Sequence, residues 1–363
     1  MSDTNHQTNY TATVDLDEAS PPLVLQTLYP SVPHAPWWQR AHIALREYLA
    51  EILGTFMLVA VGEGAVAQTV LSKGEHGDAL SVRFGFAAGI TLGVLLAGDI
   101  SGGHLNPAVT IAMAVHRGFP WTKVPGYLIA QGIGAFLGAA IIFACYIRGI
   151  DHVDGGHRTV PSWTRPPNAY PTATAGIFAT YPAQYMTTGT GFLVEMMGTT
   201  VFVLGVFAAT EPRNGAMAGL NKAVAVGISI FAVGVALGGE TSFAINPTRD
   251  FAPRIFLLMV GYGSEVFSAF NDYWWVPMIA PPVGGVLAGI IMRMFCCWPK
   301  SAEEYGRVNT HLFEDDLVEE RGKRVTETNG KVRRTSGTRS AAELDPQMRR
   351  REISAETAAT YLN

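Results

Sequence analysis

The amino-acid sequence predicts an all-α polytopic membrane protein, in which six transmembrane helices and two re-entrant half-helices form an inverted repeat. Three observations predict this fold class: the balance of apolar and charged residues, the length of the apolar stretches, and a short motif that occurs twice. The 363 residues are 48% hydrophobic and only 15% charged, and the charges concentrate toward the ends of the chain. The middle of the chain is therefore expected to lie in a membrane.

Six apolar stretches are long enough to cross a bilayer as helices. They cover about residues 45–71, 82–100, 124–147, 191–210, 223–239 and 273–295, against the ~20 residues that a spanning helix needs. Glycines recur every four positions in several of them, as at Gly85, Gly89 and Gly93, which is typical of closely packed helices in any membrane protein.

Two further apolar segments, 107–115 and 247–258, each follow an Asn-Pro dipeptide. Asn is a favoured helix cap, and Pro fits the first helical position because its missing N–H would be unpaired there anyway. At about 1.5 Å per residue, each segment spans roughly half of a ~30 Å hydrocarbon core. We therefore expect two half-helices that begin after Asn106 and Asn246 and do not cross the membrane.

An internal repeat relates the two halves of the chain. Ala-Glu-Ile-Leu-Gly-Thr-Phe at 50–56 is echoed by Val-Glu-Met-Met-Gly-Thr-Thr at 194–200, at nearly the offset that separates Asn106 from Asn246. Each half contains three spans and one half-helix. Because three is odd, the second half must be inverted relative to the first, so that the two half-helices enter from opposite faces and their N-termini converge.

The repeat and the composition together set the expected domain boundaries. Residues 1–42 form a disordered tail, 43–298 one membrane domain, and 299–363 a disordered charged tail. The membrane domain divides into halves at 43–150 and 189–298, joined by a long outer loop at 149–190. Basic residues near the span ends place both tails in the cytoplasm.

Glu51 and Glu195 lie inside apolar spans, where a carboxylate is costly unless it has partners. The irregular backbone before each half-helix has N–H groups that need acceptors, so both carboxylates are expected to brace these loops. The competing interpretation is a proton-coupling carboxylate of an active transporter. The symmetric placement favours bracing, and Glu63 is interpreted as lying at the membrane interface.

The two half-helix N-termini, with the amides of Asn106 and Asn246, are expected to face one aqueous path and to repel cations. Arg249 lies close behind the second Asn-Pro and can project into this path as a fixed positive donor. The alternative is a structural ion pair with its only neighbouring intramembrane acid, Asp250, a residue that is itself expected to brace its loop.

The sequence shows no nucleophile, metal cluster or phosphate loop, so neither an enzyme, a cofactor nor a nucleic-acid partner is expected. His104 is expected to brace its loop and not to bind metal. Cys145, Cys296 and Cys297 imply no disulfide framework. Two questions stay open: palmitoylation of Cys296 or Cys297, and phosphorylation near Thr335, Ser336 and Ser340.

These residues resemble the aquaporin family of major intrinsic proteins. The resemblance covers about residues 46–298 and rests on SGGHLNPAVT, FAINPTRDFAPR and the two Glu-x-x-Gly-Thr segments. It implies a homotetramer, in the plasma membrane, in which every protomer has its own pore, as described for aquaporin-type channels. The implied pore motifs are Asn106, Pro107 and Ala108, then Asn246, Pro247 and Thr248, where Thr248 replaces the family's Ala.

The resemblance also implies a narrow filter at Phe86, Gly234, Phe243 and Arg249. Water-selective members of the family have His at the position of Gly234 and a small residue at that of Phe243. Glycine is expected to widen the bore, while the two phenylalanines suit the carbon chain of a polyol and Arg249 its hydroxyls. The sequence therefore resembles the aquaglyceroporin branch, with features of fungal members.

The expected function is a passive pore for glycerol and small neutral solutes, with some water passing and protons excluded. Three alternatives remain at this stage. They are a water-selective channel, a proton-coupled secondary transporter that uses Glu51 or Glu195, and a membrane protein whose tails matter more than its pore.

Overall fold

The structure, a computed structural model, describes residues 36–163, 172–214, 217 and 221–296. Within them all regular structure is helical, and six helical stretches are long and apolar enough to span a membrane. The expected tail residues 1–35 and 299–363, together with Cys297 and the candidate phosphorylation positions, lie outside the described residues.

The first half of the fold contains α2 (Trp37–Leu71), α3 (Ala79–Ser101), the half-helix α4 (Pro107–His116) and α5 (Val124–Asp154). The second half contains α6 (Thr188–Ala209), α7 (Lys222–Thr241), the half-helix α8 (Pro247–Leu257), the short α9 (Glu265–Asp272) and α10 (Val276–Phe295). The order of spans and half-helices is the same in both halves, as the sequence repeat predicts.

Two boundaries differ from the sequence prediction by more than three residues. Helix α2 begins at Trp37, so its first turns lie in the stretch that was expected to be tail. Helix α5 continues to Asp154, beyond the apolar stretch that ends near residue 147. In both cases the helix runs past the apolar segment, because backbone hydrogen bonding continues through polar residues where water can solvate them.

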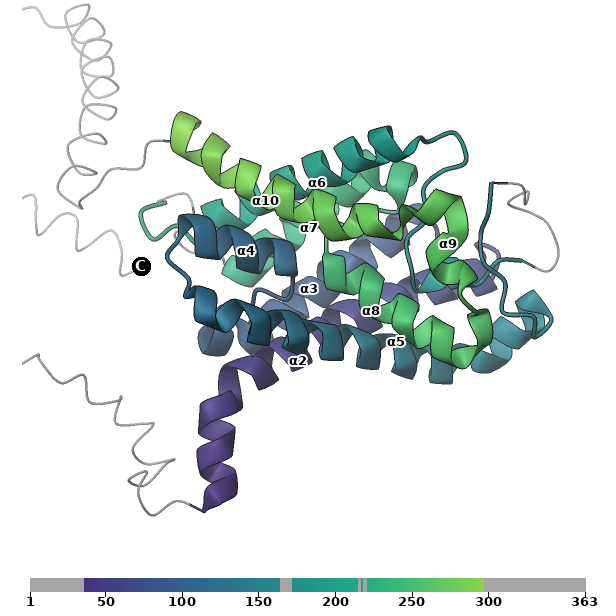
Figure 1. Cartoon of the computed structure of the whole chain (residues 1–363), viewed down its shortest axis with the longest axis horizontal. Helices are drawn as coiled ribbons and strands as arrows, with labels where there is room; N and C mark the ends of the chain where they lie inside the picture. The colour runs from purple at the N-terminus through teal and green to yellow at the C-terminus, as the bar shows by residue number, and fades with distance from the viewer. Residues whose placement is uncertain (1–35, 164–171, 215–216, 218–220, 297–363) are drawn as a thin grey trace, which may run out of the picture. The chain divides into compact units, whose positions relative to one another are not determined.

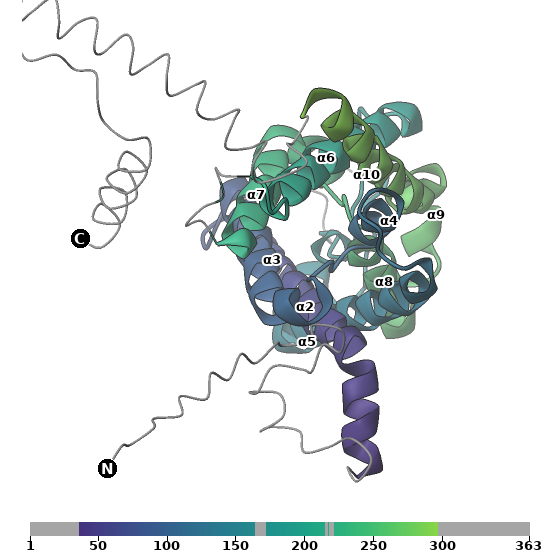
Figure 2. The same cartoon turned by 90° about the vertical axis from the view of Figure 1, so that its left-hand side faces the viewer.

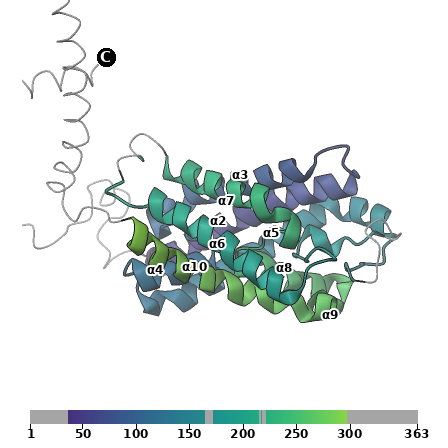
Figure 3. The same ribbon diagram turned by 90° about the horizontal axis from the view of Figure 1, so that it is seen from above.

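The two half-helices lie on opposite sides of the middle of the bundle, α4 toward one end and α8 toward the other (Figures 1 and 3). Seen from the end, α2, α3 and α5 form one group and α6, α7 and α10 the other, with α4 and α8 between α5 and α10 (Figure 2). The contacts agree, since both half-helices pack against α5 and α10.

Close packing repeats in the two halves. A Cβ atom built on Gly134 of α5 meets the carbonyl oxygen of Ile52 on α2, and one built on Gly284 of α10 meets that of Met196 on α6. Ile52 and Met196 each directly follow a repeated glutamate. These glycines let the third span of each half approach the first closely, which fixes where the half-helix between them can sit.

Candidate functional site

The two half-helices meet through a reciprocal exchange of hydrogen bonds. The side-chain amide of Asn106 donates to the carbonyl oxygen of Ile245 at 2.9 Å, and the amide of Asn246 donates to that of Leu105 at 2.8 Å. Leu105 and Ile245 have positive φ angles of 53° and 40°, a conformation that is rare for branched side chains. The strained backbone turns each carbonyl toward the opposite loop.

The side-chain oxygens of the same asparagines cap the half-helices. Asn106 Oδ1 accepts from the N–H of Ala108 at 2.8 Å. Asn246 Oδ1 accepts from the N–H of Thr248 at 3.1 Å and also from the Thr248 hydroxyl at 2.9 Å. Pro107 and Pro247 occupy the first helical positions. Threonine in place of alanine therefore adds one hydrogen bond to the second cap.

Both repeated glutamates are fully buried and accept hydrogen bonds from the loop before a half-helix. Glu51 accepts from the N–H groups of His104 at 2.9 Å and Leu105 at 2.8 Å. Glu195 accepts from the N–H groups of Ala244 at 3.0 Å and Ile245 at 2.7 Å. Each glutamate also accepts a 2.6 Å hydrogen bond from a hydroxyl group at the end of the helix that precedes the half-helix loop. The donors are Ser101 on α3 and Thr241 on α7.

His104 lies beside the first loop. Its Nδ1 is 3.2 Å from the hydroxyl of Thr110, and its ring packs against Phe119 and Tyr127, with centroid distances of 4.7 and 5.2 Å. Such packing holds the loop between the half-helix and α5. No three His, Cys, Asp or Glu side chains gather for a metal ion anywhere in the part of the chain that the structure describes.

The four residues expected to form the filter come together on the α8 side of the asparagines. The guanidinium carbon of Arg249 lies 4.6 Å from the ring centroid of Phe86, and the rings of Phe86 and Phe243 meet edge to face at 5.4 Å. A Cβ on Gly234 would lie 3.5 Å from the Phe243 ring. The two rings form an aromatic corner. The Arg249 guanidinium lies against the Phe86 ring, and the backbone of Gly234 lies beside the Phe243 ring.

A segment of the long outer loop holds Arg249 in place. Arg249 is only 5% exposed, and its Nη1 donates to the carbonyl oxygen of Phe178 at 2.9 Å. Asp250 turns away from it. The Asp250 carboxylate accepts from the N–H and hydroxyl of Thr180 at 2.7 and 2.6 Å, and from Arg254 Nε at 2.7 Å. Asp250 therefore braces the loop that positions the filter arginine.

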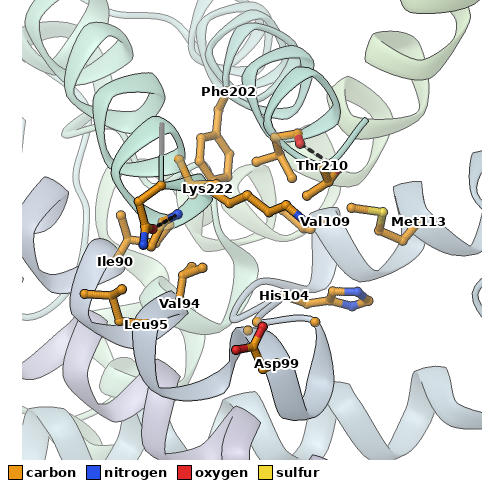
Figure 4. A pocket seen from close by; sticks show the side chains of 17 residues that line it. Ile90, Val94, Leu95, Asp99, His104, Val109, Met113, Phe202, Thr210 and Lys222 are labelled. Atoms are coloured by element: carbon orange, nitrogen blue, oxygen red, sulfur yellow. Dashed lines mark hydrogen bonds between the residues drawn. The ribbon is translucent and has the colours of Figure 1, made fainter. Parts of the chain in front are cut away.

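Cavities open on the α4 side and beside the outer loop. The first, about 360 Å³, is lined by Gly102, Gly103, His104 and Val109 from the first half and by Phe202 and Val206 from α6. Lys222 and Asp99 lie on opposite sides of it (Figure 4). The second, about 550 Å³, is lined by outer-loop residues that include Tyr181 and Tyr185, and by Ser242 just before the second half-helix loop.

The comparison with known proteins fits this geometry. The family model described as "Major intrinsic protein" matches residues 38–292. The chain belongs to this family. As a major intrinsic protein, it is an integral multi-pass membrane protein and a passive channel, not an enzyme.

Its relatives among the major intrinsic proteins include fungal channels. "Aquaglyceroporin-2" of Rhizophagus irregularis is 44% identical over 261 residues, 72% of this chain and 80% of the relative. "Aquaporin-7-2" of Laccaria bicolor is 42% identical over 277 residues, 73% of this chain and 80% of the relative. The aquaglyceroporin from Plasmodium falciparum is similar in structure, with a TM-score of 0.61 and 28% identity, covering 70% of this chain and 97% of that one.

Two expectations about charged residues in this major intrinsic protein are wrong. Glu63 is not solvated, as a carboxylate at the membrane interface would be. It is fully buried in α2, and neither carboxylate oxygen has a hydrogen-bond partner among the described residues. Glu63 and Asp250 both interact electrostatically with Arg249, but the Asp250 carboxylate is bonded to Thr180 and Arg254 and forms no ion pair with Arg249. Sequence spacing drew attention to Asp250 because it is adjacent, whereas helix packing brings Glu63 close from another span.

Sequence reasoning also missed Arg83. It lies on α3 and donates through Nε to the carbonyl oxygen of Gly234 at 2.6 Å. No periodic pattern marks this residue. Its one sequence signal is a positive charge inside an expected apolar span, three positions before Phe86. The Arg83 stem therefore occupies part of the space that a side chain at position 234 would fill.

Proposed function

We propose that the chain is a passive, bidirectional pore for glycerol and similar small neutral solutes, which passes some water and excludes protons and other ions. The observation that carries the proposal is the corner formed by Phe86, Phe243 and Arg249 beside Gly234. A fungal relative and the similar Plasmodium structure are both named aquaglyceroporins, which supports the proposal.

The corner offers a polyol two different surfaces. The carbon chain can lie against the edge-to-face rings of Phe86 and Phe243, where apolar contact replaces water. The hydroxyl groups can accept hydrogen bonds from those N–H groups of Arg249 that Phe178 does not use. For a solute that is apolar on one side and polar on the other, these contacts thus replace most of the interactions with water that it loses on entry.

Proton exclusion follows from the electrostatics along the path. Both half-helices direct their positive N-terminal ends toward the asparagine pair, and Arg249 adds a fixed charge on one side of it. Each asparagine amide has two N–H donors and uses one in the exchange between the loops. The second donor can orient a passing hydroxyl or water oxygen and so interrupt a continuous proton chain.

A transporter mechanism has less support from the same contacts. The oxygens of Glu51 and Glu195 are all engaged by hydrogen-bond donors that fix the loops. A carboxylate that must release and take up a proton in every cycle would break these bonds each time. Bracing, as expected from the sequence, is the role that we propose for both residues.

The proposal includes the arrangement in the cell. We propose a homotetramer in the plasma membrane, with both termini and the tails 1–42 and 299–363 cytoplasmic, and the loop at 149–190 outside. Large apolar side chains on the outer helix faces, such as Ile129, Ile228 and Ile279, are 64%, 58% and 52% exposed in the single chain. Lipid or a second protomer would cover them.

Stopped-flow light scattering on proteoliposomes tests the function directly. Glycerol and osmotic water permeability are compared with those of empty vesicles, with and without a proton gradient. Glycerol flux well above background and indifferent to the gradient supports the polyol pore. Water flux without glycerol flux would instead support a water-selective channel. Solute uptake that depends on the proton gradient would support a proton-coupled transporter.

A further inference from the structure

Arg83 occupies an unusual place for a charged residue in a membrane-spanning helix. It lies on α3, one turn from Phe86, and is partly buried. Its Nε donates to the carbonyl oxygen of Gly234 on α7 at 2.6 Å, so the side chain crosses from one helix to the other beside the aromatic corner. The bond connects an element of the first half to one of the second.

The Arg83 side chain takes up the space beside two glycines of α7. A Cβ on Gly234 would lie 3.1 Å from Arg83 Cγ, and one on Gly238 would lie 3.3 Å from Arg83 Nε. The same Gly238 Cβ would lie 2.9 Å from the Phe243 ring. The arginine stem and the Phe243 ring therefore flank the same stretch of bare helix, where a larger residue on α7 would otherwise project.

The charged end of Arg83 has donors to spare. A guanidinium has five N–H donors, and an arginine with no carboxylate partner keeps its full positive charge. Among the residues that the structure describes, the Gly234 carbonyl is the acceptor of Arg83, and no acidic side chain forms an ion pair with it. Arg83 is only partly buried, and its remaining donors have no acceptor among the described residues.

We infer that Arg83 is a fifth specificity-determining residue of the pore: its stem restores the narrowness that Gly234 gives up, and its guanidinium supplies a second set of donors for solute hydroxyl groups at the entrance. This inference rests on the proposed function. It also changes how the filter works, because its width is set by a side chain of α3 and not by the missing side chain of α7. Arg249 then contacts the Phe86 ring, and Arg83 lies with the Phe243 ring beside Gly234 and Gly238 of α7.

A merely structural role for Arg83, tying α3 to α7, predicts a loss of stability and equal effects on all solutes. The inference predicts a change in selectivity. Proteoliposomes containing wild-type, Arg83→Ala or Arg83→Met protein are therefore assayed with glycerol, the four-carbon erythritol and the five-carbon ribitol. Lys73→Ala, which removes an exposed cation from the turn between α2 and α3, is the matched control.

Arg83→Ala removes the stem, so the ribitol-to-glycerol permeability ratio should rise several-fold. Arg83→Met keeps most of the stem and loses the donors, so its size limit should stay near that of the wild type. Its preference for glycerol over 1,2-propanediol, which lacks one hydroxyl, should fall about threefold, the effect of one modest hydrogen bond. Lys73→Ala should change neither ratio.

A double-mutant cycle separates Arg83 from a general effect on the fold. Gly234→Ala should reduce flux in the wild type, because its methyl group meets the Arg83 stem, and should reduce it much less in the Arg83→Ala background. Gly239→Ala, whose methyl group meets no atom within 4 Å, is the control on the same helix.

The cycle is read with water as well as with glycerol, so that the two proposals can fail separately. If glycerol flux is absent but the Gly234 and Arg83 substitutions still have non-additive effects on water flux, the polyol pore is rejected. Arg83 would in that case still set the width of the pore. Unchanged solute ratios together with additive effects of the Gly234 and Arg83 substitutions would overturn the inference.

Discussion

Gly134 on α5 lies so close to the carbonyl oxygen of Ile52 on α2 that no side chain fits between the two helices. Gly284 and Met196 form the same contact in the second half. In both contacts the carbonyl belongs to the residue that directly follows a loop-bracing glutamate in the chain. The position of each buried carboxylate is therefore coupled to the helix crossing beside it.

Gly134→Ala should destabilise the protein, since overpacking a tight crossing costs about 1–3 kcal/mol. The measurement is the thermal unfolding midpoint of the detergent-purified protein. Gly132→Ala is a matched control two positions away on the same helix, because its methyl group meets no atom within 4 Å. Equal midpoints for the two variants would show that the helices separate easily at this crossing.

Glu195→Gln should lower the unfolding midpoint. Solute transport by the wild type and by the variant should both be indifferent to a proton gradient. The amide nitrogen of glutamine cannot accept, so a buried N–H of Ala244 or Ile245 loses its partner, at a cost of about 1–3 kcal/mol. Glu75→Gln, at an exposed turn, is the control. A variant with unchanged stability but lost gradient-driven uptake would point to proton coupling instead.

Arg249→Ala should admit a proton or cation leak, measured with a pH-sensitive dye trapped in proteoliposomes. The single substitution also leaves the buried Glu63 without the opposite charge of Arg249, so poor folding could obscure the result. The double variant Arg249→Ala with Glu63→Gln should recover folded protein and keep the leak. A tight double variant would assign the barrier mainly to the half-helix dipoles.

Gly234→His should reduce glycerol flux more strongly than water flux. The imidazole has to enter the space between Arg83 and Phe243, which narrows the passage for a carbon chain before it stops single waters. Gly239→His places the same ring where the backbone has open space and serves as the control. Unchanged glycerol flux in Gly234→His would contradict the assignment of the filter.

The stability difference between wild-type and Glu211→Gln protein should depend on pH. The hydrogen bond from Arg213, with a second from Arg117, lowers the pKa of Glu211 from 4.5 to about 2, although burial acts in the opposite direction. A lowered folded-state pKa means that the stabilisation is complete above pH 4.5 and is lost as the pH falls through about 2.

The difference in unfolding midpoint between these two proteins should therefore be constant above about pH 5 and should shrink toward pH 2. Differential scanning fluorimetry across this range measures it, with Glu75→Gln for comparison. A difference that stays constant down to pH 3 or below would mean that the ion pairs with Arg213 and Arg117 do not form in solution.

Local rules of sequence account for much of the fold. The lengths of the apolar stretches predict the six spans, and Asn-Pro before a short apolar run predicts where α4 and α8 begin. These features depend on neighbours in the chain. The helix ends at Trp37 and Asp154 were less predictable, because they lie where the apolar pattern has already ended.

The charged residues around the filter were harder to predict, since their partners come from distant segments. Asp250 is adjacent to Arg249 but bonds to Thr180 and Arg254, while Glu63 acts on Arg249 from the first span. Gly234 suggests empty space only until α3 supplies Arg83. Pairings of this kind depend on how the helices pack, which no pattern along one segment encodes.

The exchange between the two loops also bears on how the protein is made. The Asn106 amide donates to the carbonyl of Ile245, which lies 139 residues further along the chain. The Leu105 carbonyl accepts from Asn246, which lies 141 residues further along. During synthesis, the first half is therefore complete before the protein partners of these two groups exist. The reciprocal bonds that join α4 to α8 can form only after both halves of the chain have been made.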